Sequence, residues 1–396
     1  MLLEFEKHCW AEIDLDALQH NFALIQRTVG GPVCAVVKAD AYGHGDVTVA
    51  QTLQAAGAAA FAVSCLAEAR HLRRHGIDKP ILILGYTDPA FAAALAQGNI
   101  IQCVFSAEYA AALSRAATAA GVTVECHLKA DTGMGRIGFA LRSDFDAALA
   151  QMAACYALPG LHIAGLFQHF AVADSVVPQN EAYTDEQHAL FLRAADALRA
   201  MGHDPGALHC ANSAAQMRHP EWRGAMTRAG IILYGLDPSG EVHIEGLRPV
   251  MTLKARVTHL KMLLPGQSVS YGRTFTAEKT MQVATVCVGY ADGYPRILSG
   301  TQGGGVMLLH GAAAPVVGRV CMDQTLVDVT GIPCTPGDEI TVFGPAAAGV
   351  ADTADTIAAK TDTINYEIVC GIARRVPRVY LQHGTPTHIW NDLEDT

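Results

Sequence analysis

Ala35-Val36-Val37-Lys38-Ala39-Asp40-Ala41-Tyr42-Gly43-His44-Gly45 is an apolar, β-type segment that breaks into small and glycine residues directly after a lysine. The break predicts that Lys38 stands at the end of a strand. An amine there is partly desolvated, so it can lose its proton and form an imine with an aldehyde, whereas a lysine on a solvated helix stays protonated. Taken alone, an ordinary lysine at a strand edge is the simpler interpretation.

Similar short apolar runs recur along the first 240 residues, separated by alanine-rich stretches with helical spacing. The runs are Val33–Val37, Ala60–Cys65, Ile81–Gly85, Ile101–Phe105, Val122–Lys129, Ile163–Phe170, Leu208–Ala211 and Gly230–Leu233. Asp14 is expected to cap one helix, and Gly202 to end another. Strands alternating with helices in this way predict a parallel (β/α)8 barrel of the TIM type, with a doubly wound open sheet as the alternative.

The pattern changes near Pro238-Ser239-Gly240. The later apolar runs follow one another through Gly and Pro turns, and no full-length helix is expected before Thr353–Lys360. They are Met251–Leu260, Gln282–Val288, Gly305–His310, Pro315–Cys321, Leu326–Val329 and Glu339–Phe343. We therefore expect a barrel over residues 1–240 and a mostly β domain over residues 241–396, with a first strand, Cys9–Ile13, that can pair with either half.

Composition narrows the class of protein. The 396 residues are 51% hydrophobic, enough for a sizeable core, and the net charge of -10 comes with 28 scattered Lys and Arg residues. This charge distribution does not favour a nucleic-acid or membrane surface, so a small-molecule partner is expected. The eleven cysteines include no C-x-x-C pair and mostly lie in apolar runs, which indicates reduced thiols and a cytoplasmic location. No signal peptide, membrane-spanning segment or metal site is expected.

Gly133-Met134-Gly135-Arg136-Ile137-Gly138 formally matches a dinucleotide-binding pattern. Arg136 stands where the backbone would have to approach a pyrophosphate, and no acidic residue for the ribose follows about 20 residues later. A tight turn that presents Arg136 to an anion fits better. The guanidinium fork of arginine suits the carboxylate of an amino or keto acid.

Polar residues also stand at the ends of the last two expected barrel strands. Leu208-His209-Cys210-Ala211-Asn212-Ser213 and Thr227-Arg228-Ala229-Gly230-Ile231 place hydroxyl and amide donors where such barrels commonly hold a phosphate. Capping of a helix by Asn212 and Ser213 is the simpler alternative. His169, at the end of another strand, is either a hydrogen-bond partner in the barrel mouth or a core histidine.

The order of these residues along the chain resembles the motif pattern of a known family. Four further runs contribute: Ser268-Val269-Ser270-Tyr271-Gly272-Arg273, Val288–Arg296, Gly318-Arg319-Val320-Cys321-Met322-Asp323 and Ile364-Asn365-Tyr366-Glu367. With Lys38, Arg136, Ser213 and Arg228 ahead of them in this order, nearly the whole chain resembles bacterial alanine racemases, pyridoxal-phosphate enzymes built from a barrel and a β domain. Gln168 departs from the family, in which a threonine is expected beside the histidine.

The resemblance implies roles for individual residues. Lys38 would hold pyridoxal 5'-phosphate and serve as a base on one face of the substrate Cα, and Tyr271 would act on the opposite face. Both side chains are mostly protonated at neutral pH and need tuning neighbours. The resemblance places Arg228 at the pyridine nitrogen, and Arg136 and Met322 at the substrate carboxylate. It implies that Lys129 is carbamylated and orients Arg136, and that His169, His209 and Asp323 support the site. The residues expected around the phosphate are Tyr42, Ser213, Gly230, Ile231 and Tyr366.

The resemblance also implies a head-to-tail homodimer, in which Tyr271 serves the Lys38 of the other subunit. An access corridor for small substrates would contain Tyr290, Arg296, Arg319 and Ile364. The implied reaction is interconversion of L- and D-alanine, which supplies D-alanine for peptidoglycan precursors. Three alternatives stay open: a racemase that also accepts serine, a pyridoxal-phosphate decarboxylase and a non-catalytic carrier of the cofactor. A hydrophobic pocket rejects an added hydroxyl only about a hundredfold.

Overall fold

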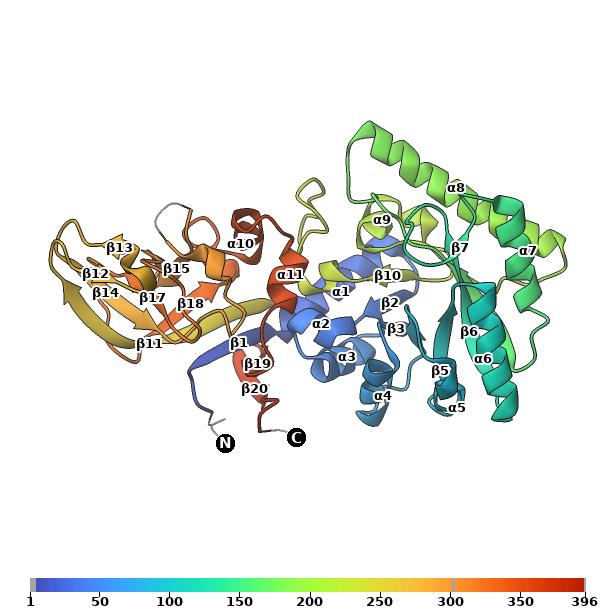
Figure 1. Cartoon of the computed structure of the whole chain (residues 1–396), viewed down its shortest axis with the longest axis horizontal. Helices are drawn as coiled ribbons and strands as arrows, with labels where there is room; N and C mark the ends of the chain where they lie inside the picture. The colour runs from blue at the N-terminus through green and yellow to red at the C-terminus, as the bar shows by residue number, and fades with distance from the viewer. Residues whose placement is uncertain (1–4, 301–302, 395–396) are drawn as a thin grey trace.

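The chain forms a barrel and a mostly β unit side by side, as the computed structural model shows (Figure 1). The structure describes residues 5–300 and 303–394. Most residues of the barrel strands are buried, and helices cover the outer side of the barrel. The predicted (β/α)8 barrel with a C-terminal mostly β domain is confirmed.

The barrel sheet has parallel strands in the order β10-β2-β3-β4-β5-β6-β8-β9. This sequential order excludes the doubly wound open sheet, in which the strand order reverses in the middle. Two backbone hydrogen bonds join the segments that carry β9 and β10 and so close the barrel. The Arg228 amide donates to the Ala211 carbonyl (2.9 Å), and the Ala225 amide donates to the Leu208 carbonyl (2.7 Å). The strands are β2 (Val33–Val36), β3 (Ala60–Val63), β4 (Ile81–Ile83), β5 (Ile100–Val104), β6 (Val124–Asp131), β8 (Leu161–Phe167), β9 (Ala207–His209) and β10 (Thr227–Ala229).

The barrel helices begin where the sequence offers capping side chains. The Asp14 carboxylate accepts from the Ala17 amide (2.9 Å) at the start of the first helix, and Asp144 accepts from Ala147 (3.0 Å) in the same way. Such caps satisfy amides that have no partner within the helix. The helices are α1 (Leu15–Val29), α3 (Asp46–Ala55), α4 (Leu66–Arg74), α5 (Ala92–Gln97), α6 (Ala107–Ala119), α7 (Phe145–Cys155), α8 (Pro178–Ala200) and α9 (Ser213–Arg218).

Two strand predictions are wrong in position. Gly230–Leu233 is not the last barrel strand, because Thr227–Ala229 pairs with β2 and the apolar run Ile231–Tyr234 turns into a 3-10 helix, η3. A short apolar run does not by itself distinguish a buried strand from a buried helical turn. In the second unit, the predicted strand Pro315–Cys321 begins where β16 (Ala312–Pro315) ends.

Lys38 opens a short left-handed turn, α2 (Lys38–Gly43), directly after β2. Four consecutive residues that are not glycine, Ala39 to Tyr42, have φ between 51° and 55°. This conformation costs roughly 1–2 kcal/mol per residue, so the surroundings must hold it. The Glu68 carboxylate accepts from the Ala39 amide (2.8 Å), and Asp40 accepts from the Asp46 amide (2.9 Å).

The second unit is built around the long strand β11 (Met251–Leu263). The first strand of the chain, β1 (Cys9–Asp14), pairs with β11 and with β19, and so belongs to this sheet. The sequence missed the C-terminal hairpin of β19 and β20. The other elements are β12 (Ser268–Val269), β13 (Phe275–Thr276), β14 (Met281–Val286), β15 (Val306–Leu309), β17 (Thr325–Asp328), β18 (Glu339–Phe343), α10 (Ala354–Lys360), α11 (Asn365–Cys370), β19 (Arg378–Gln382) and β20 (Thr385–Trp390).

The two units meet at the lysine turn. Helix α11 packs against α2 (Figure 1), and a Cβ at Gly43 would overlap the carbonyl oxygen of Val369. Arg378 of β19 is buried and donates from Nε to the Gly43 carbonyl (3.0 Å). Because α11 and β19 both contact this turn, the β unit helps to fix the position of Lys38.

Candidate active site

Lys38 lies at the carboxyl end of β2, the face on which barrels of this type carry their active sites. Its side chain is half-buried. Burial lowers the pKa of the Lys38 ammonium, and the Arg136 charge lowers it further, while Cys370 and Glu68 act in the opposite direction. A lysine with a lowered pKa releases its proton more readily and is a better nucleophile and base.

Three of the predicted phosphate residues lie together beside this turn. The Gly230 amide donates to the Ser213 hydroxyl (2.9 Å). A Cβ at Gly230 would lie 2.8 Å from the Tyr42 hydroxyl and 3.4 Å from Ser213 Oγ. Two hydroxyl groups and a glycine backbone without a side chain form a cradle of donors that suits a phosphate.

Aromatic packing holds Tyr42 in this cradle. Its ring lies 4.9 Å from the ring of Tyr234 and 6.1 Å from that of Tyr366, centre to centre. The Tyr234 hydroxyl donates to the Val36 carbonyl (2.9 Å) and so ties the stack to the end of β2. Ile231, the first residue of η3, is completely buried directly after Gly230.

Arg228 is buried and held by four hydrogen bonds. Nη1 donates to His209 Nδ1 (2.9 Å) and to the His209 carbonyl (3.0 Å). Nη2 donates to the carbonyls of Gln168 (2.7 Å) and Cys210 (3.0 Å). Among the described residues, no hydrogen bond uses Nε–H, which leaves this donor available to a ligand. The rigid setting fixes the orientation of the guanidinium.

His209 and Lys129 share an aromatic support. The His209 ring stacks on Phe167 (5.0 Å, 3° between planes), and the Lys129 ammonium lies 4.7 Å from the centre of the same ring. Burial lowers the pKa of Lys129 to about 8, and the charges of Arg228 and Arg136 contribute to the lowering. About a tenth of the Lys129 amine is therefore uncharged at pH 7, far more than for an ordinary lysine.

His169 follows Gln168 at the end of β8. Burial lowers the pKa of His169 well below its ordinary value, and the positive charge of Arg228 adds to the effect. The Gln168 side chain is hydrogen-bonded to the Thr132 hydroxyl, which also accepts from Gln187 Nε2 (3.1 Å). The Gln168 amide oxygen thus has a hydrogen-bond partner, whereas Gln168 Nε2 is buried and has none among the described residues.

The glycine-rich loop presents Arg136 as an exposed side chain. Asp131, at the end of β6, accepts from the amides of Gly133 (2.9 Å) and Gly135 (3.0 Å) and folds the loop back on the strand. The loop leads into the short strand β7 (Phe139–Ala140), which pairs with β6. Arg136 acts electrostatically on both Lys38 and Lys129, so its charge faces the barrel mouth.

The remaining predicted residues gather on the β unit. Tyr271 is 67% exposed, directly precedes Gly272 and lies in one surface hollow with Met322 and Asp323. Arg319 lies beside Gly272, and Arg375 donates to Asp323 (2.7 Å). Strands β12 and β13, which flank Tyr271, lie at the end of the β unit that is remote from the barrel (Figure 1). One chain therefore does not bring Tyr271 to Lys38.

Three predicted corridor residues are also exposed: Tyr290, Arg296 and Ile364. Ile364 precedes α11 and so lies near the lysine turn, whereas Tyr290 donates from its amide to the Cys321 carbonyl (3.0 Å) beside Met322.

The sequence analysis missed His127, whose Nδ1 lies 2.9 Å from His209 Nε2. Its spacing of two from Lys129 on one strand places both side chains on the same face, which is the signal that could have found it.

Comparisons with known proteins agree with this geometry. Family models described as the N-terminal and C-terminal domains of alanine racemase match residues 13–238 and 250–380. The alanine racemase of Desulfovibrio desulfuricans is 47% identical over 96% of this chain and 100% of its own length. The solved alanine racemase of Clostridium difficile 630 is 38% identical, with a TM-score of 0.91 over 98% of this chain and 99% of that one. That of Bacillus anthracis with bound L-Ala-P is 35% identical, with a TM-score of 0.90 over 99% and 100%. The chain belongs to the alanine racemase family of pyridoxal-phosphate-dependent isomerases.

Proposed function

We propose that this chain interconverts L- and D-alanine with two bases, Lys38 on one face of the substrate Cα and Tyr271 of the partner subunit on the other. The observation that carries the proposal is the half-buried Lys38, with its lowered pKa, at the barrel mouth. One base removes the Cα proton while the other delivers a proton from the opposite side. Inversion requires both faces, and Lys38 alone serves only one.

The residues present fit pyridoxal phosphate. The cradle of Tyr42, Ser213 and Gly230 would take the phosphate, with Ile231 and Tyr366 beside it. When bound, the cofactor supplies an electron sink that acidifies the Cα–H of the substrate. Arg228 would face the ring nitrogen with Nε–H. Because a guanidinium does not readily give up its proton, Arg228 would keep this electron sink weak and so favour rapid return of a proton to Cα.

The substrate carboxylate would bind to Arg136 and to the Met322 backbone of the partner subunit. Lys129 is buried behind Arg136, and its lowered pKa supports formation of a carbamate with carbon dioxide, because only the uncharged amine reacts. A carbamate replaces the positive charge by a negative one that attracts the Arg136 guanidinium. His169, His209 and Asp323 would hold these groups in place.

A head-to-tail homodimer follows from the remote positions of Lys38 and Tyr271. Tyr271 and Met322 are both large and exposed, at 67% and 52%, as expected for side chains that a second subunit covers. Tyr290, Arg296, Arg319 and Ile364 would then form the corridor into the shared site. The division into residues 1–240 and 241–396 is part of this proposal, with β1 assigned to the second sheet.

We further propose that the enzyme works in the cytoplasm and supplies D-alanine for peptidoglycan. All eleven cysteines are free, which fits a reducing compartment. Within the described residues, no helix is long and apolar enough to cross a membrane. The preference for alanine over serine rests on the size of the corridor, and competition between the two amino acids measures it.

The direct test is to incubate the enzyme with L-alanine in deuterium oxide and to follow both Cα deuteration and D-alanine formation. The two-base scheme predicts that the D-alanine formed carries deuterium at Cα. Exchange with complete retention of configuration would refute the scheme. Release of carbon dioxide from alanine would instead indicate a decarboxylase.

A further inference from the structure

Glu68, in the first turn of α4, joins two segments of the barrel mouth through its carboxylate. One oxygen accepts from the amide of Ala39, the residue after Lys38 (2.8 Å), and the other accepts from the amide of Ser64, the residue after β3 (2.7 Å). Two N–H groups cannot bond to each other, so they need an acceptor between them. A carboxylate serves each of them with one oxygen, whereas the amide of a glutamine offers one oxygen and, in place of the other, a donor.

The carboxylate continues the pairing of β2 with β3 past the ends of the strands. The Val37 amide donates to the Ala62 carbonyl (2.9 Å), and no later backbone hydrogen bond joins these two segments in the part of the chain that the structure describes. Hydrogen bonds that a charged group accepts are stronger than those between neutral groups. The Glu68 bridge therefore holds the chain at the point where Lys38 leaves the sheet.

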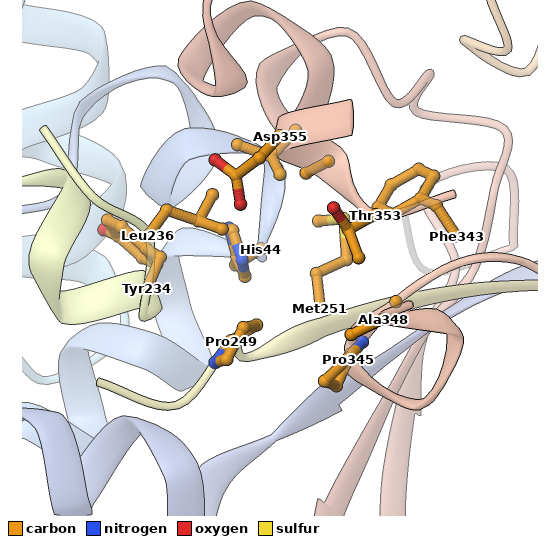
Figure 2. Close-up of a pocket in the computed structure, with 13 residues that line it drawn as sticks. His44, Tyr234, Leu236, Pro249, Met251, Phe343, Pro345, Ala348, Thr353 and Asp355 are labelled. Atoms are coloured by element: carbon orange, nitrogen blue, oxygen red, sulfur yellow. The ribbon is translucent and has the colours of Figure 1, made fainter. Parts of the chain in front are cut away.

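The far end of the lysine turn is held by other residues. His44 donates from Nδ1 to the carbonyls of Ala41 (3.0 Å) and Tyr42 (2.9 Å), since a carbonyl only accepts. The His44 ring packs against the Tyr234 ring (4.5 Å between centres), on the wall of a cavity between the barrel and the β unit (Figure 2). This end of the turn is thus fixed without Glu68.

At the near end, no other side chain among the described residues bonds to the backbone of Lys38 or Ala39. Ala39 begins the run of four left-handed residues, a conformation that is strained for residues other than glycine. Without Glu68 this strain can relax at the end of the turn that carries Lys38. The Glu68 charge also raises the pKa of Lys38 and so opposes the effect of burial.

We propose that Glu68 is a positioning residue for Lys38. It ties the start of the strained turn to the end of β3, and so fixes where the Lys38 amine stands in the barrel mouth. The proposal rests on the proposed function in one respect, that Lys38 is the base on one face of the substrate Cα. Displacement of a reacting group by about 1 Å can reduce a rate by roughly a hundredfold, so the loss of Glu68 should appear in kcat.

Glu68→Gln keeps the size of the side chain but places a donor opposite one of the two amides. Hydrogen exchange of the full-length enzyme without substrate, followed by mass spectrometry, should show the amides of residues 39–43 exchanging at least about tenfold faster, because a hydrogen bond to a charged group is lost. Peptides from β5, β6 and β8 should exchange at the parent rate. In racemisation, kcat should fall at least about tenfold while KM for alanine stays within about twofold, because Arg136, which would bind the carboxylate, is untouched.

Glu108→Gln is the matched control. Glu108 also lies in the first turn of a barrel helix, α6, but its carboxylate bonds to its own amide and to Ser106 rather than to a second segment. This variant should match the parent enzyme in hydrogen exchange, kcat and KM.

Smaller changes than these in the exchange of the turn or in the kcat of Glu68→Gln would overturn the proposal. Faster exchange throughout the barrel would also overturn it, because Glu68 would then have a general structural role, and so would a change confined to KM. The exchange measurement needs no substrate. Failure of the proposed function, seen as an inactive parent enzyme, is therefore distinguishable from failure of this proposal.

Discussion

Arg228 donates from Nη1 to His209 Nδ1 across 2.9 Å inside the barrel. An arginine only donates, so His209 carries its proton on Nε2 and donates it to His127 Nδ1 at 2.9 Å. Burial lowers the pKa of His127 to about 4 and that of His209 well below its ordinary value. Both rings are neutral at pH 7, and the direction of the whole chain of hydrogen bonds is set by Arg228.

The first prediction concerns the residue at the end of this series of hydrogen bonds. His127→Leu should lower the free energy of unfolding by about 1–3 kcal/mol, because it leaves the buried Nε2–H of His209 without an acceptor. Urea denaturation measures the change. His127→Asn, which keeps an acceptor near the position of Nδ1, should recover part of the loss. Equal destabilisation by Leu and Asn would show that the hydrogen bond does not matter.

The second prediction tests the phosphate cradle. Gly230→Ala should weaken binding of pyridoxal phosphate to the apoenzyme at least tenfold, because its Cβ would lie 2.8 Å from the Tyr42 hydroxyl. A spectroscopic titration of the apoenzyme measures the affinity. Gly240→Ala is the control, since a Cβ there meets nothing within 4 Å. Unchanged affinity in the Gly230 variant would remove this cradle from the cofactor site.

The third prediction is a pH dependence of stability caused by Lys129. Its pKa is lowered from 10.5 to about 8 in the folded chain, so between these values the unfolded chain binds more protons. Stability from this group should therefore rise by roughly 3 kcal/mol as the pH increases from about 8 to 10.5. Urea denaturation in buffer free of carbon dioxide, compared with Lys129→Met, isolates the contribution.

The control for that experiment is Lys79→Met, which replaces an exposed lysine. It should keep the pH dependence of the parent chain, whereas Lys129→Met should lose the Lys129 part. The same rise in Lys129→Met as in the parent would show that Lys129 is not the group responsible.

The fourth prediction concerns Lys38 as a base. Lys38→Ala should reduce racemisation at least about a thousandfold, within the range that a positioned base contributes. Added methylamine should restore part of the rate, because the cavity left by the side chain admits a small amine. Recovery is measured as D-alanine formed against amine concentration. Near-normal turnover of the variant without added amine would exclude Lys38 from the reaction.

Local sequence predicted much of the barrel and the position of Lys38. Runs such as Val33–Val36 are wholly buried strands, and their apolar composition is visible without any partner. Ile231–Tyr234 is equally apolar and buried yet helical, because its conformation depends on the turn that follows Gly230. Strand β20 was missed because its residues are exposed or half-buried and carry no apolar alternation.

The contacts within the site depend on residues far apart in the sequence. His127 and His209 are 82 positions apart and meet only when β6 and β9 take their places on either side of β8. Arg228 likewise takes its four acceptors from His209 at the end of β9 and from Gln168 and Cys210, which directly follow β8 and β9. Residue types could be assigned from motifs, whereas tautomers, pKa shifts and the left-handed turn at Lys38 required the folded chain.

The central claim is that each active site takes Lys38 from one subunit and Tyr271 from the other. Lys38→Ala and Tyr271→Phe, each inactive alone, should regain activity when equal amounts are dissociated, mixed and reassembled. A mixed dimer then has one intact site of two, so random pairing predicts about one quarter of the parent racemisation rate. The deciding measurement is the D-alanine formation rate of this mixture: about a quarter of the parent rate supports the shared site, and no gain over the separate variants would contradict it.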